Sequence, residues 1–185
     1  GCSSVLTLDL GQGVEEIGAG AFKGLTKVTT LTIPDSVKTM GSSAFQGMSA
    51  LLELNLNRNT KQYGDNVFGS ASKLPSVVLP EGMTEVASNM FASCSALTTV
   101  TIPETVTVIH KNAFRSCKKL TNLILPQNLT SIDDGAFYSC SALTSVTIPD
   151  KVTYVGEGAF RDSTSMTALT IGASVETIGG FAFYG

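Results

Sequence analysis

The sequence predicts a repeat solenoid, in which each short unit of chain adds one turn and one short parallel strand to a continuous stack. Eight of the nine Phe residues recur at intervals of 23 residues, and no insertion or deletion breaks this register over the 185 residues. Self-similarity at a period of about 20–50 residues is typical of repeat architectures. The eight recurring residues are Phe22, Phe45, Phe68, Phe91, Phe114, Phe137, Phe160 and Phe183.

Each unit is numbered from the apolar residue that opens it, so that the recurring Phe occupies position 18. Positions 4 and 6 are aliphatic in every unit, and no linker or composition shift interrupts the period. We therefore expect residues 1–185 to form a single solenoid without separate domains, with residues 1–4 as the tail of a preceding unit. The eight units start at Val5, Val28, Leu51, Leu74, Leu97, Leu120, Leu143 and Met166.

The first part of a unit reads as a strand. Residues 143–149 alternate apolar Val146 and Ile148 with Ser145 and Thr147, the two-residue period of a half-buried strand. Proline at position 7, as in Pro149, lacks the N–H that a ladder needs and ends this strand. A second short extended piece, residues 152–155, follows it.

The second part of a unit reads as a corner and a single helical turn. Gly at position 14 in five units supplies permissive backbone for the corner. Ala136, Phe137 and Cys140 then fall at i, i+1 and i+4, on one face of a helical turn. One turn is too short to stand alone, so the units have to stack, strand to strand and Phe to Phe.

Composition excludes several other classes of protein. Only 15% of the residues are charged, the net charge is −3 and the mean hydropathy is +0.24, which argues against disorder. No apolar run approaches the roughly 18 residues of a membrane helix, and no signal-peptide pattern opens the chain, so we expect no membrane insertion in this segment. A pI near 5.1 with scattered acids makes nucleic acid an unexpected partner.

The pattern Leu-Thr-x-Val-Thr-Ile-Pro-x-x-Val-x-x-Ile-Gly-x-x-Ala-Phe-x-x-Cys, read almost in full at residues 143–163 and 97–117, resembles the BspA-type leucine-rich repeats. The unit starting at Leu51 departs from it at residues 57–62, where we expect a distorted turn. The resemblance implies a right-handed leucine-rich-repeat superhelix in a secreted or cell-surface protein associated with adhesion. It supplies no catalytic residue, cofactor or fixed ligand motif.

The four cysteines share repeat position 21, next to the Phe column. Cys94, Cys117 and Cys140 belong to consecutive units, and Cys2 falls in the same register. Parallel stacked side chains do not bring their Cβ atoms together, so the sequence favours free core thiols over disulfides. Zinc is disfavoured as well, because tetrahedral ligation needs ligands around a point and not along a line.

Nothing in the sequence predicts an enzyme. His110 is the only histidine, expected at an exposed turn, and the nucleophile motif Gly-x-Ser-x-Gly does not occur. Acids recur at position 8, just after the strand, where they fit a turn-stabilising role better than a weak calcium site. We therefore expect no catalytic residue, no metal and no cofactor. The four acids at position 8 are Asp35, Glu81, Glu104 and Asp150.

Two further surface features have both a structural and a functional interpretation. One is a local basic cluster that comprises Lys111, Arg115, Lys118 and Lys119. The favoured interpretation of this cluster is solvated surface, and the alternative is a site for an anionic partner. Asn128 begins the one N-glycosylation sequon, which matters only for a eukaryotic secreted chain.

The surface best placed to bind a partner is the strand face, whose outward positions are 3 and 5. Most of it carries hydroxyl groups, and Val78 and Ile124 stand out as β-branched apolar residues on either side of Thr101. The two residues either form a binding patch or are present only because β-branched residues are favoured in strands. The candidate binding face comprises Asn55, Val78, Thr99, Thr101, Asn122, Ile124, Ser145 and Thr147.

The leading hypothesis is a non-enzymatic module that binds a protein or glycan partner on this face and acts in adhesion at the cell surface or outside the cell. The alternative is a structural spacer, or a repeat segment that associates end to end, because neither terminal unit reads as a cap. Light scattering separates the two, since self-assembly depends on concentration.

Overall fold

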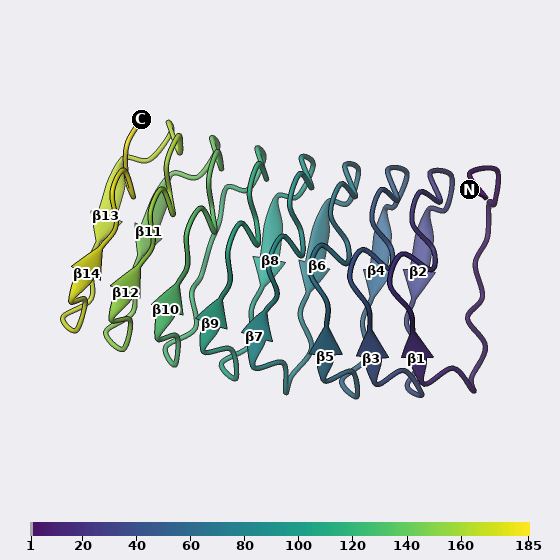
Figure 1. Cartoon of the computed structure of the whole chain (residues 1–185). Coiled ribbons are helices and arrows are strands. Elements are labelled where there is room, and N and C mark those ends of the chain that lie inside the picture. The colour runs from purple at the N-terminus through teal and green to yellow at the C-terminus, as the bar shows by residue number, and fades with distance from the viewer. Residues whose placement is uncertain (1) are drawn as a thin grey trace.

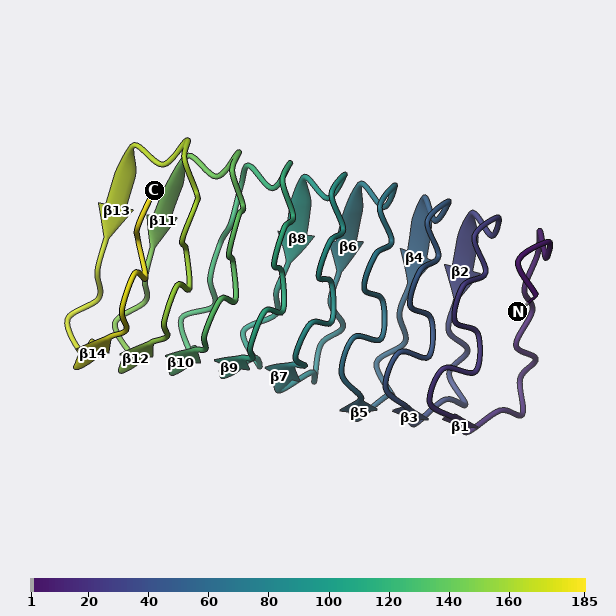
Figure 2. The same cartoon turned by 45° about the horizontal axis from the view of Figure 1, so that its top comes forward.

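The computed structural model describes residues 2–185, which wind into a solenoid of parallel strands with no helix in this part of the chain. Successive turns stand side by side from the N-terminal to the C-terminal end (Figure 1). Two columns of strands run along the body, and Figure 2 shows them on different sides of the coil. The solenoid predicted from the 23-residue period is therefore confirmed.

The first column contains the strands at repeat positions 3–5. Every strand of this column except the last, β13, has one buried residue between two exposed ones. All pairs are parallel with partners 23 residues apart, such as Val77 and Val100. The strands are β2 (Thr30–Thr32), β4 (Glu53–Asn55), β6 (Ser76–Val78), β8 (Thr99–Thr101), β11 (Ser145–Thr147) and β13 (Ala168–Thr170).

The second column contains the short extended pieces at positions 12 and 13, and every unit has one. They form one sheet of three strands and one of five, separated between β5 and β7. The strands are β1 (Glu16–Ile17), β3 (Thr39–Met40), β5 (Gln62–Tyr63), β7 (Glu85–Val86), β9 (Val108–Ile109), β10 (Ser131–Ile132), β12 (Tyr154–Val155) and β14 (Thr177–Ile178).

The distorted turn expected at residues 57–62 lies beside the break between β5 and β7. Asn57 replaces the usual proline and is buried, and its side chain replaces the missing packing with hydrogen bonds. Its Nδ2 donates to the Pro34 carbonyl at 2.6 Å, and its Oδ1 accepts from the backbone N–H groups of Asn59 and Thr60, each at 2.7 Å. The buried amide is thus fully paired, as a buried polar group has to be.

The predicted helical turn is wrong in detail. Residues at positions 16 and 20 take left-handed backbone, as at Asn112 (φ 56°) and Ser116 (φ 60°), and this breaks any helix into consecutive turns. The N–H groups of Asn112, Phe114 and Ser116 instead donate to carbonyls of the next unit at 2.7–3.0 Å. The segment therefore forms a third hydrogen-bonded column along the solenoid, although Ala136, Phe137 and Cys140 are buried together as expected.

Glycine at position 14 has a different reason from the one expected. A Cβ at Gly41 would collide with the main chain of Ala19, and one at Gly156 with that of Asp133 and Asp134. Neither glycine has a positive φ. Close approach of the preceding unit, and not a permissive backbone, is what selects glycine at these corners.

A continuous stack of aromatic rings runs through the core, among buried aliphatic side chains. Neighbouring Phe rings of the repeat lie 5.1–5.8 Å apart between centroids and are tilted by 19° or less. This is the separation of favourable offset stacking. Phe45 through Phe160 of this column are fully buried, whereas Phe22 and Phe183 at its two ends are partly buried.

We expect Phe114→Ala to lower the free energy of unfolding by about 3–5 kcal/mol, because it opens a cavity and removes two stacking contacts. The matched change Phe22→Ala should cost clearly less, because Phe22 is partly buried and has one stacking neighbour among the described residues. Urea unfolding followed by circular dichroism measures both. Equal losses would contradict a core that depends on stacking between units.

The cysteines give a second prediction. Cys94, Cys117 and Cys140 are buried free thiols, and burial raises the pKa of Cys94 and Cys140 to about 12. Because the thiolate is the reactive form, these thiols should resist alkylation at pH 8 in the native protein, while the exposed Cys2 reacts. Mass spectrometry should count one modified thiol natively and four in denaturant. Any count below four in denaturant under non-reducing conditions would indicate a disulfide.

Candidate functional site

The structure places all eight residues of the candidate binding face on the solvent side of the first strand column. Val78 is 66% exposed and Ile124 is 75% exposed, and the other six are exposed polar side chains. Val78 lies directly opposite Thr101 in the β6–β8 pair, and Thr99 is bridged to Asn122 in the following unit. The face therefore brings together residues that are 23 and 46 positions apart in the sequence.

The expected strand is missing from two of the eight units. In the unit starting at Val5 no first-column strand forms, and in the unit starting at Leu120 that strand is reduced to the single bridge at Asn122. The first column consequently consists of three separate two-stranded ladders, β2–β4, β6–β8 and β11–β13. Ile124 sits between two of these ladders, on backbone that belongs to no strand.

A surface hollow of about 340 Å³ lies between β4 and β6, which belong to separate ladders and are not paired with each other. It is lined by Leu52, Glu53, Asn55, Val78 and Pro80, among others. The Asn55 amide donates to Glu53 Oε1 at 3.0 Å, so the polar side of the hollow is held in place. The hollow combines apolar and amide groups, as protein-binding surfaces commonly do.

Sequence reasoning missed Leu52, which is 53% exposed in this hollow. It occupies position 2, where five of the eight units have Thr. A large apolar residue in a column of hydroxyl residues was the available signal. It extends the exposed apolar surface of the strand face beyond Val78 and Ile124.

His110 is not a freely exposed turn residue. Its side chain is 33% exposed and lies between two carboxylates, with Nδ1 2.9 Å from Asp133 Oδ2 and Nε2 3.2 Å from Glu85 Oε2. Partial burial by itself lowers the His110 pKa, but hydrogen bonds to Asp133 and Glu85 and their charges outweigh it, and the pKa is raised. The cluster joins three successive units, and the Ser131 hydroxyl donates to Asp133 Oδ1 at 2.7 Å.

Two of the four acids of position 8 accept hydrogen bonds from the turn of the next unit. Glu104 Oε2 accepts from the backbone N–H of Gln127 at 2.7 Å, and Asp150 Oδ1 accepts from that of Ala173 at 3.1 Å, each in the next unit. Residues 2–185 contain no group of three His, Cys, Asp or Glu side chains placed to share a metal ion. No helix in the same range is long and apolar enough to cross a membrane.

Asn128 lies on the turn after the first column, with its side-chain amide already engaged. Nδ2 donates to the Glu104 carbonyl at 3.0 Å, and Oδ1 accepts from Lys151 Nζ at 2.7 Å. Nδ2 is the atom to which an N-linked glycan would be attached, so a glycan there would have to coexist with or displace the contact to Glu104.

The basic cluster expected from the sequence spreads over several repeat positions. Arg115, Lys118 and Lys119 lie at positions 19, 22 and 23, whereas Lys111 lies at position 15 and lines a surface pocket together with Arg115. The Arg115 guanidinium sits over the Tyr138 ring at 4.9 Å from its centroid.

The His110 cluster predicts a pH effect on stability. Because the folded pKa is raised, the contribution is fully present below the ordinary His value of 6.5 and is lost as the pH rises through the folded pKa. Relative to His110→Gln, the native chain should gain on the order of 1–2 °C in Tm near pH 5.5, a small value because water screens the pair. Near pH 8.5 the difference should vanish, and a pH-independent difference in thermal scans would disprove the charge contribution.

The family comparison agrees with this geometry. The family model described as BspA type Leucine rich repeat region matches residues 1–120 and 85–185 in six copies. No curated protein matches the chain. The first of the similar solved structures is a leucine-rich repeat protein from T. pallidum, which is 28% identical over 83% of this chain and 72% of its own, with a TM-score of 0.78.

Two other solved structures extend the likeness. A leucine-rich repeat protein from Bacteroides ovatus shares the fold at 21% identity, with a TM-score of 0.77 over 98% of this chain and 58% of its own. A leucine rich cell surface protein from Faecalibacterium prausnitzii is 25% identical over 88% of this chain and 59% of its own, with a TM-score of 0.56. This chain thus spans less than two thirds of each of these two proteins. With the repeat, the stacked core and the family model in agreement, the chain belongs to the BspA-type leucine-rich repeat family.

Proposed function

We propose that this chain is a non-enzymatic binding module of an extracellular or cell-surface protein, and that it engages a protein or glycan partner in adhesion through its strand face. The observation that carries the proposal is the exposed apolar surface of Leu52, Val78 and Ile124, set among hydroxyl and amide groups on a regular scaffold. A repeat scaffold of this kind is suited to binding because its faces are extended and rigid.

The chemistry of the strand face supports recognition by shape and hydrogen bonding. Thr99, Thr101, Ser145 and Thr147 present hydroxyl groups that both donate and accept, and no ionisable group of the eight-residue face offers long-range steering. Leu52 and Val78 line one hollow, and exposed apolar side chains that lie together in this way are more typical of an interaction surface than single scattered ones. The description of the Faecalibacterium prausnitzii structure as a cell surface protein supports the location.

The test uses the double variant Val78→Asp and Ile124→Asp. Its control is Thr107→Asp and Thr153→Asp, which adds the same two charges at exposed sites two units apart on the other side of the coil. Both proteins are screened against an array of purified extracellular-matrix proteins and surface glycans. We expect the strand-face variant to weaken capture by about tenfold or more, with an unchanged Tm, because a buried charge opposes an apolar contact.

Three outcomes would count against the proposal. If the native chain captures no partner, or if both variants bind as it does, then the strand face is not the binding surface. If light scattering shows chains that lengthen with concentration, the alternative of end-to-end self-association gains support instead.

A further inference from the structure

The charges of this protein are separated between two sides of the solenoid. The basic edge is defined as repeat positions 19–23 of every unit, and it carries seven Lys and Arg residues against one acid, a formal charge of +6. The remaining positions carry five bases and fourteen acids, a formal charge of −9, which accounts for the net −3. The cations of the basic edge are Lys23, Lys27, Lys73, Arg115, Lys118, Lys119 and Arg161.

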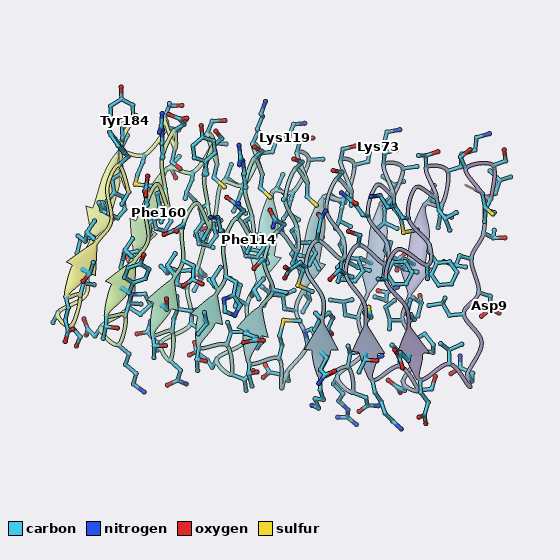
Figure 3. The ribbon with its side chains drawn as sticks, viewed as in Figure 1. Asp9, Lys73, Phe114, Lys119, Phe160 and Tyr184 are labelled. Atoms are coloured by element: carbon cyan, nitrogen blue, oxygen red, sulfur yellow. The ribbon has the colours of Figure 1, made fainter. Side chains whose placement is uncertain are left out.

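The basic edge is a continuous rim of the molecule. Lys73, Lys119 and Tyr184 point outward along the same side in Figure 3, across the ends of the turns. The second-column strands lie at the opposite side of the coil (Figure 1). The concentration of positive charge is therefore a feature of the folded surface, in a chain whose net charge is negative.

Lysine recurs at position 23 in every second unit along this rim. Lys27, Lys73 and Lys119 are exposed and take part in no ion pair among residues 2–185. Ala50 and Ala96 occupy the same position in the units between them. The ammonium groups are thus spaced by two turns, roughly 10 Å along the axis at the usual strand separation, and the side chains between them in this column are short.

Arginine and tyrosine alternate at position 19 toward the C-terminal end. Arg115 and Arg161 lie over the two sides of Tyr138, at 4.9 and 5.8 Å from its ring centroid, and Arg161 also lies 5.4 Å from Tyr184. Arg161 Nε is buried and lies 4.0 Å from Asp162 Oδ2, so only the outer guanidinium nitrogens of Arg161 can face an anion. Stacking on the rings holds the two guanidinium groups two turns apart.

We infer that the basic edge binds a linear acidic polysaccharide that lies parallel to the solenoid axis, with its carboxylate or sulfate groups on the cations. Acidic groups that recur at every second sugar ring would match cations that recur at every second turn. The Ser column at position 22 adds hydroxyl groups for the sugars, and Ser72 and Ser95 donate to the preceding unit while their oxygens stay available as acceptors.

The surroundings favour a polysaccharide over other polyanions. Single-stranded nucleic acid binds by stacking bases on a series of exposed aromatic faces, whereas the aromatic residues of this edge are Tyr138, which guanidinium groups cover on both sides, and the exposed Tyr184. A membrane surface needs large apolar side chains that insert beside the cations. Between Lys27 and Lys119 the position-23 column offers only alanine and lysine. A flat, hydroxylated chain with spaced anions fits this surface.

The inference does not rest on the proposed function, because the basic edge and the strand face are different surfaces. The variant Val78→Asp and Ile124→Asp leaves every cation of the basic edge in place. Binding of an acidic polysaccharide should therefore survive in that variant, so failure of one proposal is distinguishable from failure of the other.

The experiment measures binding to heparin oligosaccharides, hyaluronan oligosaccharides and neutral dextran in about 0.15 M salt, a concentration that screens weak surface charge. The triple variant Lys27→Gln, Lys73→Gln and Lys119→Gln should bind the acidic oligosaccharides about tenfold more weakly, as expected for three exposed charge pairs. The matched control Lys38→Gln, Lys61→Gln and Lys151→Gln removes the same charge from the opposite side and should change affinity less than twofold.

The outcomes are decisive in both directions. If the chain binds heparin but not hyaluronan, the recognised group is sulfate. If it binds both oligosaccharides, carboxylate is recognised as well. Either result, together with the expected difference between the two triple variants, supports the inference. Equal weakening by the two triple variants, or no binding to either oligosaccharide, would overturn it. So would equally tight binding to single-stranded DNA or to phosphatidylserine vesicles. If the triple variant fails to fold, Arg115→Gln with Arg161→Gln replaces it, with the same expected loss.

Discussion

The contact between one unit and the next is the interaction on which the whole structure depends. A single 23-residue turn buries no core by itself, and nearly every backbone ladder and every Phe stacking contact joins residues of neighbouring units. The register has to stay constant for this to work, because a shift of one residue would misplace the Phe ring and the strand face together. Constant register is also what turns repeat positions into straight columns on the surface.

The third hydrogen-bonded column shows how the chain satisfies its backbone without a helix. Left-handed residues at positions 16 and 20 rotate alternate peptide planes, so that the N–H groups of positions 16, 18 and 20 all point to the next unit. Left-handed backbone is disfavoured for most residues, and glycine and asparagine tolerate it best. This accounts for Gly and Asn at position 16 in most units, and the strain at Ser116 and its equivalents is accepted for three hydrogen bonds per turn.

Function on such a scaffold is set by the columns that no packing requirement constrains. The strand face uses few charges and offers apolar and hydroxyl groups, whereas the basic edge uses mostly charge. These surfaces lie on different sides of the same turns, so one rigid body can present two chemistries at once. His110, between Glu85 and Asp133, shows that a column can also tie three units together through charge.

The sequence alone determined the solenoid, the buried columns and the outward placement of the strand-face residues, because a strict period leaves one way to bury eight Phe rings. It did not determine the turn geometry at position 16, the reason for glycine at Gly41, or the loss of a strand at Asn122. Those depend on how closely the backbones of adjacent turns approach, which only the tertiary structure decided. The spacing of 46 residues, twice the period, places Lys27, Lys73 and Lys119 in one column, but the fold decided that this column lies on an exposed rim, because exposure depends on which part of each turn packs against the core.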